Sequence, residues 1–128
     1  MRFLYKGKDG GPDSPVTGYW LIEIKWLFSI VILHFKDGWR ENFHNHAFNA
    51  LTWLLKGKAV EQTYKDAKVK PYKRSIFPKF TSRSNMHRVR SYGNTWMLSL
   101  RGPWQNTWEE YCPASETFIT LTHGRKVL

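Results

Sequence analysis

One long run of β-branched and aromatic residues, from Val16 to Phe35, limits what this chain can fold into. Its first half alternates between an apolar set and a mixed set: Trp20, Ile22, Ile24 and Trp26 against Leu21, Glu23 and Lys25. A period of two predicts a strand with one buried face. The second half is almost continuously apolar, as in a strand covered on both sides, and Asp37-Gly38 then signals a turn.

Strand-like segments recur along the rest of the chain. They are Phe43–Leu55, Val60–Tyr64, Ser75–Phe80, His87–Tyr92, Thr95–Leu100 and Phe118–Thr122. We expect turns at Lys56-Gly57-Lys58 and Gly93-Asn94, and a loop over Lys6–Ser14. No segment shows a helical pattern, a repeat or a domain boundary. The sequence therefore predicts one all-β domain over residues 1–128, with residues 1–15 as an N-terminal extension or loop.

The charge balance is strongly basic, with 20 Lys+Arg against 10 Asp+Glu and a net charge of +10. This balance favours an anionic partner, which could be nucleic acid, a membrane surface or a small anionic substrate; the alternative is a solvated surface without such a partner. The longest apolar stretch, Trp26–Phe35, is too short to span a membrane, and no signal peptide is visible. Cys112 is the only cysteine, which fits a reducing compartment. We expect a cytoplasmic protein.

The most informative short motif is His44-Asn45-His46. Residues i and i+2 of a strand point to the same face, about 6–7 Å apart along the strand. Both imidazoles can therefore converge on one metal ion. The remaining histidines that do not belong to a motif, His34 and His123, are expected to be structural or exposed.

The motif's surroundings resemble the cupin superfamily. Gly38 precedes His44-Asn45-His46 by five residues, and Gly57 follows His46 after ten. The wider pattern is similar to small cupin-like proteins commonly encoded by bacteriophages. It consists of His44–Glu61, then His87-Arg-Val, then Trp96–Pro103. The resemblance implies a small cupin-type jelly-roll barrel in which His87 joins His44 and His46 at a metal site. It also makes a homodimer an expectation.

The chain departs from the cupin pattern at two places. The family's motif Glu falls here at Ala50 or Leu51, and Ser82 and Ser84 stand where a Pro-x-Gly precedes the later His. Three readings follow. The site could consist of the three histidines alone, which suits Fe, Zn, Ni, Mn or Cu. It could borrow a carboxylate, from Glu61 or secondly from Glu41. The barrel could also have lost its metal.

The pocket's other residues follow from strand alternation. If His87 points inward, Val89 and Ser91 share its face. On the next strand, we expect the apolar set Trp96, Leu98 and Leu100 to line the barrel. Arg101 could then bind a carboxylate or phosphate at the mouth, with a surface ion pair as the alternative.

A basic stretch from Lys65 to Arg83 is interleaved with aromatic residues, among them Tyr72, Phe77 and Phe80. Such a stretch can bind single-stranded nucleic acid, or it can be a solvated loop anchored by its aromatics. The sequence therefore favours two alternative functions. One is a metal-binding cupin, such as a small non-haem-metal oxygenase or related enzyme. The other is a non-catalytic phage-encoded accessory or virion protein whose basic surface binds nucleic acid or a protein.

Overall fold

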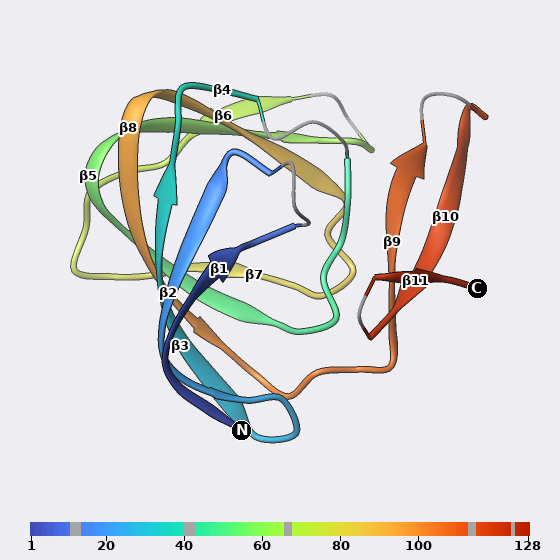
Figure 1. The fold of residues 1–128 in the computed structure, drawn as a ribbon. Coiled ribbons are helices and arrows are strands. Elements are labelled where there is room, and N and C mark those ends of the chain that lie inside the picture. The colour runs from blue at the N-terminus through green and yellow to red at the C-terminus, as the bar shows by residue number, and fades with distance from the viewer. Residues whose placement is uncertain (11–13, 40–42, 66–67, 113–114, 124) are drawn as a thin grey trace.

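The computed structural model describes residues 1–10, 14–39, 43–65, 68–112, 115–123 and 125–128 (Figure 1). All regular elements in these ranges are strands, and every strand pair is antiparallel. The prediction of an all-β protein without helices is confirmed for this part of the chain. No helix there is long and apolar enough to cross a membrane.

The strands follow the chain in this order: β1 (Arg2–Lys8), β2 (Val16–Ile24), β3 (Phe28–Phe35), β4 (Gly38–Trp39), β5 (Ala50–Thr63), β6 (Val69–Pro71), β7 (Lys79–Thr81), β8 (His87–Arg101), β9 (Thr107–Cys112), β10 (Thr117–Thr122) and β11 (Lys126–Val127). The large sheet has the order β1-β2-β3-β8-β5-β6, with β4 on β8 and β7 on β5. It curves into a jelly-roll barrel around a core that includes Val31, Leu33 and Met97 (Figure 1).

A small sheet of β9, β10 and β11 lies beside the barrel (Figure 1). The segment before β5 connects it to the barrel. The main-chain N–H of Asn45 donates to the carbonyl of Glu109 at 3.0 Å, and that of Tyr111 donates to Phe43 at 2.8 Å. The histidine motif therefore runs between the barrel and the small sheet.

The two longest strands, β5 and β8, bend together. They do so at the positions where turns were predicted. Leu54 pairs with Met97 and Lys58 pairs with Tyr92, so both halves of β5 run along β8 without reversing. The register shifts around Lys56, and Gly57 and Gly93 both have positive φ. The predicted turns at Lys56–Lys58 and Gly93-Asn94 are therefore wrong. Each glycine lies at a bend in a continuous strand, and Val60–Tyr64 is no separate return strand.

The face of β8 that enters the barrel also differs from the expectation. β8 continues through Gly93. Three consecutive residues at the bend, Tyr92 to Asn94, are exposed, but the buried residues on both sides of them fall at alternate positions of one series: His87, Val89, Ser91, Thr95, Met97, Ser99 and Arg101. The prediction that Trp96, Leu98 and Leu100 line the barrel is wrong. Leu98 and Leu100 pair with Ile32 and Ile30 on β3 and share their outward face. Hydrophobicity alone predicts the wrong buried face for β8, because the face of β8 that enters the barrel is partly polar.

Two other segments differ from the expectation. The loop expected over Lys6–Ser14 is wrong for Lys6–Lys8, because β1 pairs with β2 from Arg2 to Lys8. In the basic stretch, β6 and β7 pair with β5. The expected strand Ser75–Phe80 is regular only from Lys79, where β7 begins.

Candidate metal centre

Main-chain hydrogen bonds hold His44 opposite His87. The N–H of each residue donates to the carbonyl of the other, both at 2.9 Å, as in a hydrogen-bonded antiparallel pair. On its other side His44 forms a second bridge with Glu110 of β9. The motif is therefore not a regular strand, although His44 is aligned by strand-type bonds on both sides. Both His44 and His87 are buried.

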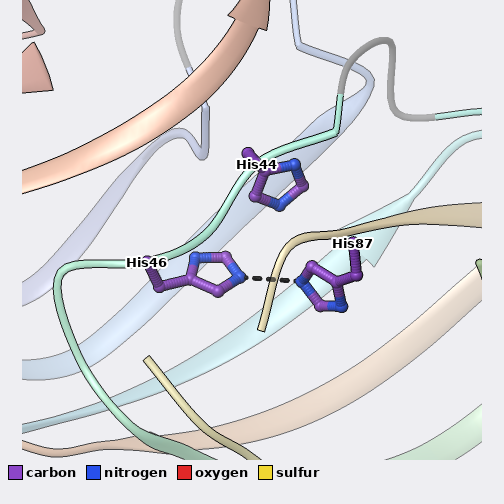
Figure 2. Close-up of side chains that lie close together, drawn as sticks. All are labelled: His44, His46 and His87. Carbon is purple, nitrogen blue, oxygen red and sulfur yellow. Dashed lines mark hydrogen bonds between the residues drawn. The ribbon is translucent and has the colours of Figure 1, made fainter. Parts of the chain in front are cut away.

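His46 completes the cluster from the same segment. Its ring stacks on Phe48, with centroids 5.0 Å apart, and faces His87. The three imidazoles point toward one another (Figure 2). One ligand nitrogen from each lies within 4.8 Å of the others, and Nε2 of His46 is 3.0 Å from Nε2 of His87. The predicted convergence of His44, His46 and His87 is thus observed.

Glu61 holds the ring of His87 from behind. Its Oε2 accepts a hydrogen bond from Nδ1 of His87 at 2.5 Å, and its Oε1 pairs with Nζ of Lys79 at 2.9 Å. A carboxylate can only accept, so Nδ1 of His87 carries a proton and Nε2 is the nitrogen that faces the cluster.

The charge of Glu61 is stabilised in place. Its burial raises the pKa, but hydrogen bonds and positive charge from His87 and Lys79 outweigh burial and lower the pKa to about 2. Glu61 is therefore an anion at any ordinary pH. Asn85 adds a longer contact, with Nδ2 donating to Oε2 of Glu61 at 3.4 Å.

The other predicted site residues lie elsewhere. Glu61 is outside the group of converging ligand atoms, since it contacts the far nitrogen of His87. Glu41 lies outside the described residues. His34 accepts or donates a hydrogen bond with Asn94 at 3.1 Å, and His123 stacks on Trp104. As predicted, neither of these histidines belongs to the cluster.

Two cavities meet at the histidines. A small one of about 50 Å³ contains all three, and a larger one of about 380 Å³ contains His44 and His46 but not His87. Asp9, Phe48 and Arg101 line both. The cluster is therefore reached from the larger cavity past His44 and His46. Its inner end is closed by core residues such as Met97.

Arg101 lies between the two cavities instead of at the mouth. Its side chain is buried and pairs with Asp9, with Nη2 and Oδ2 2.8 Å apart. The guanidinium carbon also lies 4.7 Å from the centre of the Phe48 ring. Its Nε has no hydrogen-bond partner among the described residues. The ion-pair alternative is thus observed, but inside the protein.

The donor set suits a transition metal. Two nitrogens bound to one ion at about 2.1 Å in a tetrahedral site lie ~3.4 Å apart. The 3.0 Å between Nε2 of His46 and Nε2 of His87 is close to this spacing. Imidazole nitrogen is a favourable ligand for Zn, Cu, Fe and Ni. A carboxylate behind one ligand, as at His87, is a common arrangement in metal sites.

The barrel has the fold of solved cupin structures. No protein-family model matches the chain, and no curated protein matches it either. Among solved structures, the chain is similar to a sugar phosphate isomerase from a cupin superfamily of Silicibacter pomeroyi, at 12% identity and TM-score 0.62, covering 89% of this chain and 76% of that one. A cupin superfamily protein of Desulfitobacterium hafniense matches at 19% identity and TM-score 0.55, covering 69% and 77%.

Ectoine synthase from P. lautus is also similar, at 13% identity and TM-score 0.59, covering 70% of this chain and 65% of that one. The protein therefore has the cupin fold, as the sequence resemblance implied. At these identities the likeness concerns the fold alone.

Sequence reasoning missed several residues around the site. Lys79 and Tyr72 were counted only as part of a basic stretch, yet Lys79 pairs with Glu61 and Tyr72 lines the small cavity. Burial and the charge of Glu61 raise the pKa of the Tyr72 hydroxyl, which keeps it protonated. Lys25 and Trp104 of the larger cavity were also missed. They come from separate loops, and no local pattern connects them.

Proposed function

We propose that this protein is a metal-dependent enzyme in which His44, His46 and His87 bind one divalent transition metal ion. The observation that carries the proposal is the convergence of three ligand nitrogens within 4.8 Å at the end of a cavity. Three protein ligands leave coordination positions open, as catalytic sites do and closed structural sites do not.

Each residue around the cluster has a defined task in this account. Glu61 fixes the tautomer and orientation of His87, and Lys79 holds Glu61. Phe48 supports the ring of His46. When bound, the ion would supply Lewis acidity, and with Fe or Cu also redox chemistry such as dioxygen activation. Three neutral imidazoles leave its charge uncompensated, which favours an anionic substrate or hydroxide at the open positions.

Elemental analysis of tag-free protein tests the proposal. The protein is reconstituted separately with Fe(II), Mn, Ni, Cu and Zn and then freed of excess metal. We expect about one ion per chain for at least one metal, and loss of that ion in His46→Ala and His87→Ala. His123→Ala, which removes an imidazole outside the cluster, is the control and should keep it. Failure of every metal to bind would overturn the proposal.

A second function is favoured by one surface observation. Phe77 and Phe80 in the basic stretch are 76% and 60% exposed, and Lys73 and Arg74 are exposed nearby in sequence. Exposed rings among cations can stack on bases while the cations contact phosphates. This surface would bind single-stranded nucleic acid, as an accessory or virion protein of a bacteriophage could.

Fluorescence anisotropy with a labelled single-stranded oligonucleotide tests this second function. Binding should weaken steeply between 50 and 200 mM salt because phosphate contacts release counterions. Phe77→Ala should weaken it further at fixed salt, whereas Phe3→Ala, at an exposed ring on β1, should not. Equal effects of the two variants, or no binding at low salt, would contradict a nucleic-acid surface.

A further inference from the structure

The larger cavity carries an excess of positive charge. Its basic side chains are Arg2, Lys8, Lys25, Arg101 and Arg125, and its acidic side chains are Asp9, Glu23 and Glu110. Each acid pairs with an arginine: Asp9 with Arg101 at 2.8 Å, Glu110 with Arg125 at 2.7 Å, and Glu23 with Arg2 at 3.8 Å. The acids are therefore already compensated.

The two lysines have no carboxylate partner among the described residues. Nζ of Lys8 reaches only the hydroxyl of Thr17, at 3.5 Å. Nζ of Lys25 lies 4.7 Å from the centre of the Trp104 ring, and the main-chain N–H of Trp104 donates to the carbonyl of Lys25 at 2.6 Å. An ammonium and an indole face are thus held together at the cavity wall. Lys25 is half-buried, which strengthens its attraction for an anion.

The cavity is also rich in aromatic surface. Its rings belong to Tyr5, Trp20, Phe48, Trp104 and Trp108. Trp104 contacts Phe48 and Trp108 with ring centroids 5.3 and 5.6 Å apart. These rings form a continuous wall beside His46, because Phe48 also stacks on that histidine. Such a wall suits a flat, unsaturated body better than a flexible polar one.

We infer that the larger cavity binds a small aromatic anion, with its carboxylate or phosphate group near Lys25 and its ring beside the aromatic wall that includes Trp104 and Trp108. The cavity volume of about 380 Å³ is at the small end for ligand sites, which suits one ring with its substituents. This inference rests on the proposed function only where it makes the anion a substrate, since a ligand there adjoins His44 and His46. The anion-binding step itself needs no metal.

Isothermal titration calorimetry on EDTA-treated protein tests the inference apart from the metal site. The probes are benzoate, phenyl phosphate, inorganic phosphate and benzyl alcohol. We expect at least one of the two aromatic anions to bind about tenfold or more tightly than inorganic phosphate and benzyl alcohol. The tighter of the two identifies the head group. Equal binding of inorganic phosphate or of benzyl alcohol, or no binding of any probe, would overturn the inference.

Variants locate the site. Lys25→Gln should weaken the aromatic anion about tenfold, the cost of one charge-assisted hydrogen bond. Lys56→Gln removes the same charge from an exposed position outside both cavities and should have no effect. Trp104→Leu should abolish the preference for aromatic over inorganic anions, and Trp104→Phe should restore most of it. Thermal unfolding checks that each variant is folded.

The results separate the two proposals. Aromatic-anion binding that persists in protein unable to retain any metal supports the cavity and overturns the metal site. If the protein retains a metal but the EDTA-treated protein binds no anion, the metal site is supported and the anion-binding cavity is overturned. Equal effects of Lys25→Gln and Lys56→Gln would show that the overall charge alone attracts the probe, and would overturn the inference.

Discussion

Oε2 of Glu61 accepts the hydrogen bond that Nδ1 of His87 donates, and the two residues lie on neighbouring strands, β5 and β8. The contact leaves Nε2 of His87 facing Nε2 of His46. The carboxylate therefore acts on the metal centre through a ligand. It keeps the ring of His87 from turning.

Replacing Glu61 with Gln should weaken metal binding without removing a ligand. We expect the affinity to fall about 10–100-fold, with one ion per chain still bound at saturation. Competition with a chromogenic chelator measures both quantities. Glu109→Gln, at an exposed carboxylate, is the charge-matched control and should match the wild type. Complete loss of the ion from folded Glu61→Gln protein would mean that Glu61 is itself a ligand.

Metal affinity should fall as the pH falls. An imidazole must be unprotonated to bind a metal, so protons compete with the ion. Glu61 does not contribute to this loss, because its pKa of about 2 keeps it ionised throughout. The same competition measured from pH 8 to pH 5 should show progressive weakening as the pH falls. A flat profile would contradict binding through imidazoles.

The bend shared by β5 and β8 should depend on Gly57. A Cβ there would lie 2.6 Å from the carbonyl oxygen of Asn94, at a φ of +97° that side chains disfavour. Gly57→Ala should lower the free energy of unfolding by about 2 kcal/mol or more. At Gly93, φ is +75° but no atom lies within 4 Å of a Cβ. Gly93→Ala should therefore cost about 1 kcal/mol, and urea unfolding that ranks the two in the opposite order would contradict this geometry.

The inward face of β8 can be tested with two neighbouring residues. Met97 is fully buried in the main core, whereas Leu98 points to the outer face. Met97→Ala should lower the free energy of unfolding by about 2–5 kcal/mol. Leu98→Ala should cost about 1 kcal/mol or less. Chemical unfolding of both variants decides between this arrangement and the one that hydrophobicity alone suggested.

The histidine cluster was predictable because its signal is local. His44 and His46 are two residues apart, and the surrounding glycines resemble a known motif that implies a third histidine. Strand-type bonds to His87 then bring the cluster together, even though the motif itself is not a regular strand. The all-β fold was predictable for the same reason, since the period of two that marks a strand is a property of neighbouring residues.

The roles of Glu61 and Arg101 depended on information that the sequence carries only weakly. A glycine with positive φ can end a strand or bend it, and Gly57 and Gly93 were predicted as turns although each lies inside a continuous strand. Along β5 the register shifts around Lys56 also change the parity of the buried residues, from Ala50 and Leu54 to Ala59 and Glu61. The continuous strands place Glu61 behind His87 and turn Arg101 inward. The pairing of Lys25 with Trp104 joins two distant loops, so it required the tertiary structure.

X-ray absorption spectroscopy of the reconstituted protein tests the central claim most directly. The account predicts three imidazole ligands at about 2.0–2.1 Å for Zn, with the remaining positions filled by solvent oxygen. The His87→Ala variant should show fewer imidazoles or no bound metal. A spectrum without imidazole scattering, or one that His87→Ala leaves unchanged, would contradict a metal centre built from His44, His46 and His87.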